Sequence, residues 1–187
     1  MIKYFTFYVI LAISYSSCVS GYKLNAKAQQ AFPESWIGNW EGTLKIYAGK
    51  GLVQSPPMEV IIKKIDTSDV RYNFELIYGE NKQEGRRPYQ LIVKDPSNGL
   101  FVNDEMNSIQ MEEYFIGNKL YCWFEVEGTL LLSTFEKMDN KLFFEIVAGS
   151  SIPISNSGGQ KFNGEEIPLV KTYPVKSCQK ATLIKKK

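Results

Sequence analysis

Residues 36–47 read Trp-Ile-Gly-Asn-Trp-Glu-Gly-Thr-Leu-Lys-Ile-Tyr, and the alternation inside this stretch decides the fold. Apolar or small residues occupy every second position and mostly polar residues lie between them: Trp40, Gly42, Leu44 and Ile46 against Glu41, Thr43, Lys45 and Tyr47. A period of two places successive side chains on opposite faces of a strand. The stretch therefore predicts a strand with one buried face.

The same alternation recurs along the chain. It is found in four further runs, Val70–Tyr78, Tyr89–Val93, Leu120–Val126 and Leu142–Ala148. Residues typical of tight turns separate the runs, and they include Asp95–Gly99, Gly117-Asn118, Glu127-Gly128 and Asp139-Asn140. We count about nine or ten strands spaced by roughly 8–12 residues, and no stretch has the 3.6-residue period of an amphipathic helix.

This pattern predicts an all-β fold, an antiparallel up-and-down β-barrel of about 8–10 strands. Closure is favoured because it removes the exposed edges of the sheet. An open two-sheet sandwich is the alternative. Two stretches, Ala48–Pro57 and Gly149–Pro168, are too long for tight turns. The second is rich in Ser, Gly and Asn, and we expect it to be flexible surface.

Gly38 and Trp40, after Phe32-Pro33-Glu34-Ser35, resemble the Gly-x-Trp opening of the lipocalin and wider calycin superfamily. The resemblance implies a cup-shaped barrel in which Trp40 plugs the closed end. The chain lacks the paired helices of fatty-acid-binding proteins and the haem-binding histidine of nitrobindin-like barrels. It also resembles small exported Bacteroidetes proteins of unassigned function. The ligand and the chemistry are left open.

The length and composition of the chain limit the classes of function that it can have. The chain has 187 residues with 44% hydrophobic content, which suits one core and one domain, predicted here over residues 32–187. The net charge of +2 argues against nucleic-acid binding. The sequence has no histidine, which removes imidazole as a general base or as a ligand of a metal or haem. We expect no cofactor and no metal site.

The N-terminal segment predicts export. Lys3 precedes the uncharged apolar stretch Tyr4–Tyr15, which suits a signal peptide and is shorter than the roughly 20 residues of a membrane-spanning helix. Ser16-Ser17-Cys18 resembles a bacterial lipobox, so residues 1–17 form the signal peptide if Cys18 is lipidated. Cleavage after Ala28 is the alternative, giving a signal peptide of residues 1–28. Residues 18–31 are expected to be a linker, and the protein a cell-envelope lipoprotein or a secreted or periplasmic protein.

The count of three cysteines favours lipidation of Cys18, because an odd number then becomes an even one. If Cys18 carries lipid, Cys122 and Cys178 remain as a pair that an oxidising compartment would allow to form a disulfide. A buried free cysteine is an equally good interpretation of each.

Five residues are candidates for ligand binding inside the barrel. Arg87 and Tyr89 share an apolar face, as do Tyr72 and Tyr78, and Asp104 is in phase with the apolar residues just before it. Arg87 would pair with a carboxylate or phosphate, and the tyrosine hydroxyls would meet the polar end of a ligand. The alternative is that Arg87 lies at the rim in an ion pair with Asp104.

These observations predict an exported protein, not an enzyme, that binds a small hydrophobic or amphipathic molecule in a lipocalin-like barrel. The first alternative is a surface module for protein or glycan with a filled core, because Tyr121, Trp123, Phe135 and Phe143 fall out of phase with the inner face. The second is a carboxylate-dependent hydrolase. Neighbouring acids such as Glu112-Glu113 point to opposite faces of a strand, so a catalytic pair would need acids from different strands.

Five lysines lie in the last twelve residues with no acid among them. This basic tail, together with a lipid at Cys18, would favour attachment to an anionic membrane. A solvated terminus is the alternative. The oligomeric state is not indicated.

Overall fold

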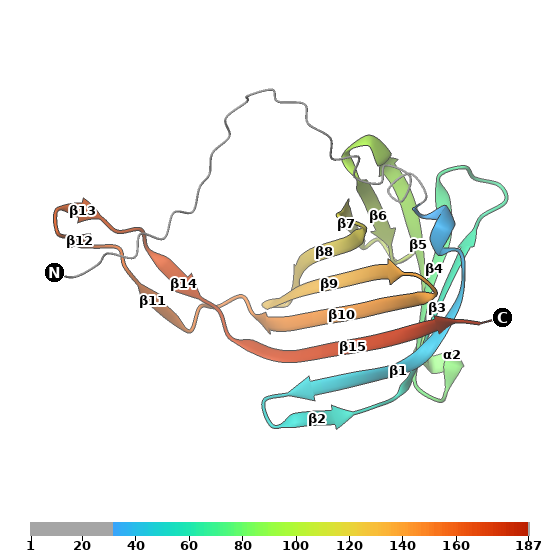
Figure 1. Cartoon of the computed structure of the whole chain (residues 1–187), viewed down its shortest axis with the longest axis horizontal. Coiled ribbons are helices and arrows are strands. Elements are labelled where there is room, and N and C mark those ends of the chain that lie inside the picture. The colour runs from blue at the N-terminus through green and yellow to red at the C-terminus, as the bar shows by residue number, and fades with distance from the viewer. Residues whose placement is uncertain (1–31, 187) are drawn as a thin grey trace.

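The computed structural model describes residues 32–186, and ten of its strands close into one antiparallel barrel (Figure 1). The barrel strands are β1 (Gly38–Ala48), β3 (Pro57–Lys64), β4 (Arg71–Tyr78), β5 (Arg86–Asp95), β6 (Leu100–Asp104), β7 (Gln110–Ile116), β8 (Lys119–Val126), β9 (Thr129–Met138), β10 (Lys141–Ser150) and β15 (Val175–Lys185). Each pairs with its neighbour in chain order, and β15 also pairs with β1. The predicted all-β up-and-down barrel is confirmed.

The inner face is apolar because the period-two pattern places one large side chain in every second position. Leu44, Phe74, Leu91, Leu120 and Leu183 are among the buried side chains of the core. Phe135 also belongs to this core and lies 5.2 Å from Phe74, measured between ring centroids. The expectation that Phe135 faces outward is wrong. Phe135 lies on the inner face of β9, and its neighbours Thr134 and Glu136 lie on the outer face.

A short 3-10 helix, η1 (Glu34–Trp36), lies at one end of the barrel, which we call the closed end. Phe32 stacks on Phe115 with 4.4 Å between centroids and packs edge-on against Trp36. Trp40 is fully buried, and its indole Nε1 donates a hydrogen bond of 2.9 Å to the Trp36 carbonyl oxygen. These aromatic side chains fill this end of the barrel.

The tight turns use the residues that the sequence predicted. Both residues of Gly117-Asn118, between β7 and β8, have positive φ, and so do both residues of Glu127-Gly128, between β8 and β9. This is the backbone geometry of a two-residue hairpin loop whose twist matches the strands. The strand order of the barrel therefore follows from local turn chemistry.

The two long stretches form additional strands. Ala48–Pro57 contains β2 (Gly51–Gln54), which extends the sheet beside β1. The stretch after β10 forms a ribbon, the arm, which projects from the barrel (Figure 1) and contains β11 (Ser155–Ser157), β12 (Lys161–Phe162), β13 (Glu165–Glu166) and β14 (Val170–Thr172). The stretch is largely exposed surface, as expected, and it also has regular structure, because Asn163 and Gly164 both have positive φ and close a hairpin between β12 and β13.

Two further single turns of helix are α2 (Lys82–Gly85), between β4 and β5, and the 3-10 turn η2 (Pro96–Asn98), between β5 and β6. No helix among residues 32–186 is long and apolar enough to cross a membrane. The predicted signal peptide, its cleavage after Ala28 or before Cys18, and the linker 18–31 lie outside the described residues.

The basic tail is largely part of the barrel, which corrects the expectation of a free terminus. Lys176, Lys180 and Lys185 belong to β15, the strand that closes the sheet. Lys180 lies over the ring of Tyr47 and Lys185 over the ring of Trp40, 5.5 Å from its centroid in the second case. These lysines are held against aromatic rings of β1.

Candidate functional site

An interior cavity of about 110 Å³ lies in the half of the barrel away from η1. Its lining comes from β4 to β10 and combines apolar side chains with polar ones. The lining polar and sulfur-bearing side chains are Tyr78, Tyr89, Asn103, Glu105, Met111, Glu113, Cys122 and Ser133. The cavity has room for several waters or a small head group and is below the roughly 300–1,000 Å³ of a site for a drug-sized ligand.

Glu113 is the central polar group of this cavity. It lies on β7 in phase with Met111 and Phe115, and it is buried on the inner face. The amide Nδ2 of Asn103, on β6, donates to Glu113 Oε1 over 3.3 Å. Glu113 Oε2 and Asn103 Oδ1 have no hydrogen-bond partner among the described residues. Burial raises the pKa of Glu113 to about 8, against the opposing effect of the Asn103 hydrogen bond.

Tyr78 and Tyr89, two of the five predicted ligand-binding residues, both line this cavity. Burial raises the pKa of both phenols, and the nearby Arg87 guanidinium opposes this shift in each. Burial likewise raises the pKa of the Cys122 thiol to about 12, with a smaller contribution from Glu113. These groups stay neutral near pH 7.

The barrel wall is split beside the cavity. β7 and β8 are paired only from Tyr114↔Tyr121 to Ile116↔Lys119, near their turn. Beyond those pairs an open groove of about 710 Å³ is lined by the facing stretches of the two strands. Met111, Phe124 and Glu105 line both this lateral groove and the cavity. Trp123, which is 74% exposed, stands on the wall of the lateral groove.

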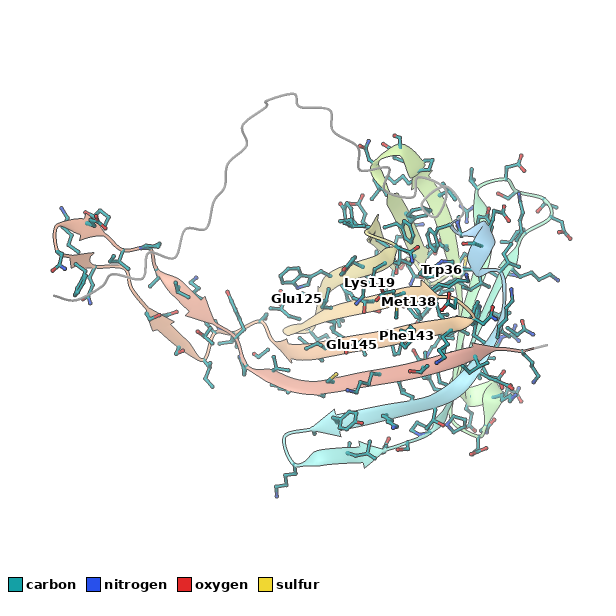
Figure 2. The ribbon with its side chains drawn as sticks, in the orientation of Figure 1. Trp36, Lys119, Glu125, Met138, Phe143 and Glu145 are labelled. Carbon is teal, nitrogen blue, oxygen red and sulfur yellow. The ribbon has the colours of Figure 1, made fainter. Side chains whose placement is uncertain are left out.

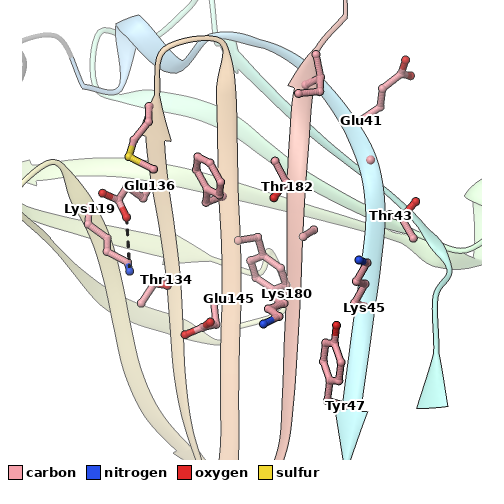
Figure 3. Close-up of a pocket in the computed structure, with 16 residues that line it drawn as sticks. Glu41, Thr43, Lys45, Tyr47, Lys119, Thr134, Glu136, Glu145, Lys180 and Thr182 are labelled. Atoms are coloured by element: carbon pink, nitrogen blue, oxygen red, sulfur yellow. Dashed lines mark ion pairs between the residues drawn. The ribbon is translucent and has the colours of Figure 1, made fainter. Parts of the chain in front are cut away.

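A second groove of about 690 Å³ lies on the outer face of β8, β9, β10, β15 and β1 (Figure 3). We call it the outer groove. Lys119, Met138, Phe143 and Glu145 lie along this face in Figure 2. Lys119 Nζ lies 3.7 Å from Glu136 Oε2, as the dashed line of Figure 3 marks. The outer groove is lined by lysines, glutamates and aromatic rings, so its surface is charged and partly aromatic.

The remaining predicted ligand residues lie away from the cavity lining. Arg87 is exposed at the rim and donates to the carbonyl oxygens of Glu84 and Arg86. Tyr72 lies at the closed end, where its hydroxyl donates to Glu34 Oε1 over 2.7 Å. Asp104 shares a face of β6 with Leu100 and Val102, as predicted, but that face is the outer one, because Phe101 and Asn103 are the inner residues. There it lies 3.9 Å from Arg71, and the predicted ion pair with Arg87 is not formed.

Cys122 and Cys178 are both free, so the disulfide considered above is absent. Cys122 faces the interior from β8, whereas Cys178 pairs with Tyr47 and Val147 at outward positions of β15. β9 and β10 lie between the two strands. The two sulfur atoms therefore lie on opposite faces of the wall and cannot meet.

Sequence reasoning missed Asn103 and treated Glu113 only as half of an adjacent acid pair. A signal for Glu113 was present, since it interrupts the apolar phase of Met111 and Phe115. Glu105, just after the end of β6, and Glu113, on β7, line one cavity, so two acids do share a site. Among residues 32–186, no three acids or cysteines cluster as metal ligands would.

The closed ten-strand barrel, with one filled end and a cavity toward the other, defines a calycin-like fold. No family model matches the sequence, and no curated protein matches it. Two solved structures share the fold. One is a protein of unknown function from the DUF3598 family of Nostoc punctiforme PCC 73102, with a TM-score of 0.54 and 12% identity over 82% of this chain and 48% of that one. This chain thus spans about half the length of that protein.

The other is an S-type phycobiliprotein lyase from Guillardia theta, with a TM-score of 0.53 and 10% identity over 84% of this chain and 92% of that one. At these identities the likeness extends to the fold alone. The predicted lipocalin-like architecture is confirmed at that level.

Proposed function

We propose that this protein is an exported binding protein that holds a small hydrophobic or amphipathic molecule in its barrel. The observation that supports it is the interior cavity, whose lining residues Glu105, Met111 and Phe124 also line the lateral groove between β7 and β8. A buried polar cavity beside a break in the barrel wall is suited to a ligand that enters from the side.

The sizes of the two spaces suggest how such a ligand lies. The cavity of about 110 Å³ admits a head group, and the lateral groove of about 710 Å³ can hold a longer body. Trp123, Val126 and Ile109 are exposed on or beside that groove and offer apolar surface. Covering this surface would contribute roughly 25 cal/mol per Å² removed from water.

Native mass spectrometry of the protein purified from its own cells tests the proposal. We expect a co-purifying small molecule, and we expect Ser133→Phe, which fills the cavity from β9, to remove it. Thr182→Phe is the matched control, because it places the same ring in the outer groove. A bare polypeptide mass at every collision energy, with nothing extracted by solvent, would contradict ligand binding.

The intact mass of the same sample tests export. A mature chain beginning at Cys18 with added lipid supports a membrane-attached lipoprotein, and one beginning at Gln29 supports a secreted or periplasmic protein. A mass that retains Met1–Ser17 on the mature chain would contradict export.

A surface module for protein or glycan is the second candidate, and the outer groove favours it. The groove is several times larger than the cavity and carries Tyr47, Phe143 and Lys180 on one face. Under this alternative Thr182→Phe abolishes binding to a glycan array or partner, and Ser133→Phe leaves it unchanged. The same pair of variants therefore separates the two functions in opposite directions.

A further inference from the structure

The cavity holds two buried oxygens that accept no hydrogen bond from the described residues, although its lining also carries the hydroxyls of Tyr78, Tyr89 and Ser133. Glu113 Oε2 and Asn103 Oδ1 are both buried without partners among the described residues. The Asn103 amide nitrogen donates to the other carboxyl oxygen, Glu113 Oε1. No lysine or arginine among the described residues lines the cavity. Burial raises the pKa of the cavity phenols Tyr78 and Tyr89, and the Arg87 charge opposes this rise, but Arg87 stays exposed at the rim and donates to carbonyl oxygens there.

Leaving such acceptors unpaired is costly. A buried polar group without a partner costs about 1–3 kcal/mol, and more when it is charged. Native interiors therefore pair these groups, and those that remain unpaired call for an explanation. A group that donates two hydrogen bonds at this point would satisfy both oxygens, and a positive charge would also favour the ionised form of Glu113.

We propose that the cavity receives the protonated amine end of an amphipathic ligand, held by the Glu113 carboxylate and Asn103 Oδ1. This inference rests on the proposed function and assigns the chemical class of its ligand. The ammonium has three N–H donors, which suffice for both oxygens with one left for a hydroxyl of Tyr78 or Tyr89. The apolar body of the ligand extends along the lateral groove past Trp123.

Binding is coupled to a proton. The Glu113 carboxyl is mainly neutral at pH 7 because burial raises its pKa to about 8. An ammonium that enters with its charge makes the carboxyl ionise, so one proton leaves Glu113 for solvent and the O–H bond is exchanged for an ion pair. The other titratable groups that line the cavity are Tyr78, Tyr89, Glu105 and Cys122. Burial holds the two phenols and the thiol in their protonated forms over this range.

Calorimetry of the whole chain with three six-carbon probes tests the inference. We expect hexylammonium to bind at least tenfold more tightly than hexanol or hexanoate. Glu113→Gln should weaken hexylammonium at least tenfold and leave hexanol unchanged, because the amide keeps the shape and loses the charge. Glu112→Gln is the matched control, since Glu112 is next to Glu113 on β7 but faces outward and pairs with Lys94 at 2.7 Å.

The wild-type chain gives a second readout that needs no variant at Glu113. Titrations in buffers of different ionisation enthalpy should show release of close to one proton per hexylammonium at pH 7. The affinity for hexylammonium should rise from pH 6 to pH 8, and Glu105→Gln should keep that rise. The affinity for hexanol should not change with pH.

The outcomes separate the inference from the proposed function. Equal binding of hexylammonium by wild type and Glu113→Gln, or tightest binding of hexanoate or hexanol, overturns the amine assignment while ligand binding stands. Absence of binding for all three probes also overturns it. The proposed function falls separately, when native mass spectrometry finds no co-purifying molecule.

Discussion

Glu113 makes the stability of the barrel depend on pH. Its carboxyl has a pKa of about 8 in the folded chain and an ordinary value of 4.5, because burial disfavours the charge. The folded state then holds a proton that the unfolded state has lost, so the contribution of Glu113 to stability is greatest below about pH 4.5 and is lost as pH rises toward 8. We expect a loss of a few kcal/mol over this range, measured by urea unfolding at each pH.

Glu113→Gln isolates that effect at the same residue. The amide does not titrate, so the variant should lack this fall between pH 5 and pH 8 and should exceed wild type in free energy of unfolding at pH 8. Parallel pH profiles for the two proteins would show that Glu113 is ionised or solvated in the folded state.

Gly38 occupies a position that needs glycine for two reasons. Its φ is +149°, and a Cβ there would meet Lys185 Cε, the side chain that lies over the Trp40 ring. We expect Gly38→Ala to cost about 1–3 kcal/mol of unfolding free energy, from the strained backbone and the lost cation–π contact. Gly49→Ala, where a Cβ meets nothing within 4 Å, should change stability by less than about 0.5 kcal/mol in the same denaturant experiment.

The two cysteines should differ in reactivity. Cys122 lies in the interior with its pKa raised to about 12, whereas Cys178 is partly exposed on β15 with a smaller rise. Because the thiolate is the nucleophile, iodoacetamide at pH 8 should modify Cys178 well before Cys122 in the folded chain. Peptide mass spectrometry after a time course measures this. If neither thiol reacts until a reductant is added, the two cysteines form a disulfide, and their assignment as free thiols is wrong.

At the scale of elements, the arm is separable from the barrel. β10 and β15 continue their pairing up to Gly149↔Val175, and Ser150 N donates to Pro174 O over 3.2 Å, which closes the ladder before the arm begins. Replacing Ser151–Tyr173 with Asn-Gly should therefore give a hairpin and leave the thermal midpoint within a few degrees of wild type. It should also improve solubility, because Ile152, Phe162 and Val170 are exposed on the arm. Circular dichroism checks the midpoint, and a large drop would show that the arm supports the fold.

The sequence predicted the barrel better than the site, and the reason is physical. Alternation and turn residues are local, so Leu44, Phe74 and Leu142 were correctly predicted on the inner face, and Gly117-Asn118 was correctly predicted as a turn. The Asn163-Gly164 hairpin was overlooked, although it carries the same turn signal. The site depends on where β7 and β8 stop pairing, a long-range property that no local pattern records. The outward phase of Asp104 was missed because β6 is short and apolar on both faces.

At the scale of the whole molecule, one chain of hairpins becomes a barrel only when its last strand returns to its first. β15 pairs with β1 on one side and β10 on the other, and its inner residues Ala181 and Leu183 are buried. The distant solved structures keep this architecture at 10–12% identity. What is shared at that level is the fold alone, so the cavity groups Glu113 and Asn103 are described for this chain only.

Closure makes the barrel one cooperative unit, and Leu183 tests this. Leu183 has no exposed surface and lies opposite Leu142 on β10 and Gly42 on β1. Leu183→Ala should cost about 2–5 kcal/mol, since it removes buried methyl groups and leaves a space at the seam. Thr182→Ala, one residue earlier and exposed on the outer face, should cost less than about 0.5 kcal/mol. If the barrel unfolds as a whole, urea unfolding of Leu183→Ala keeps the wild-type m-value and shifts only the midpoint. A second transition, or a lower m-value, would mean instead that β15 separates from β1 before the remaining strands unfold.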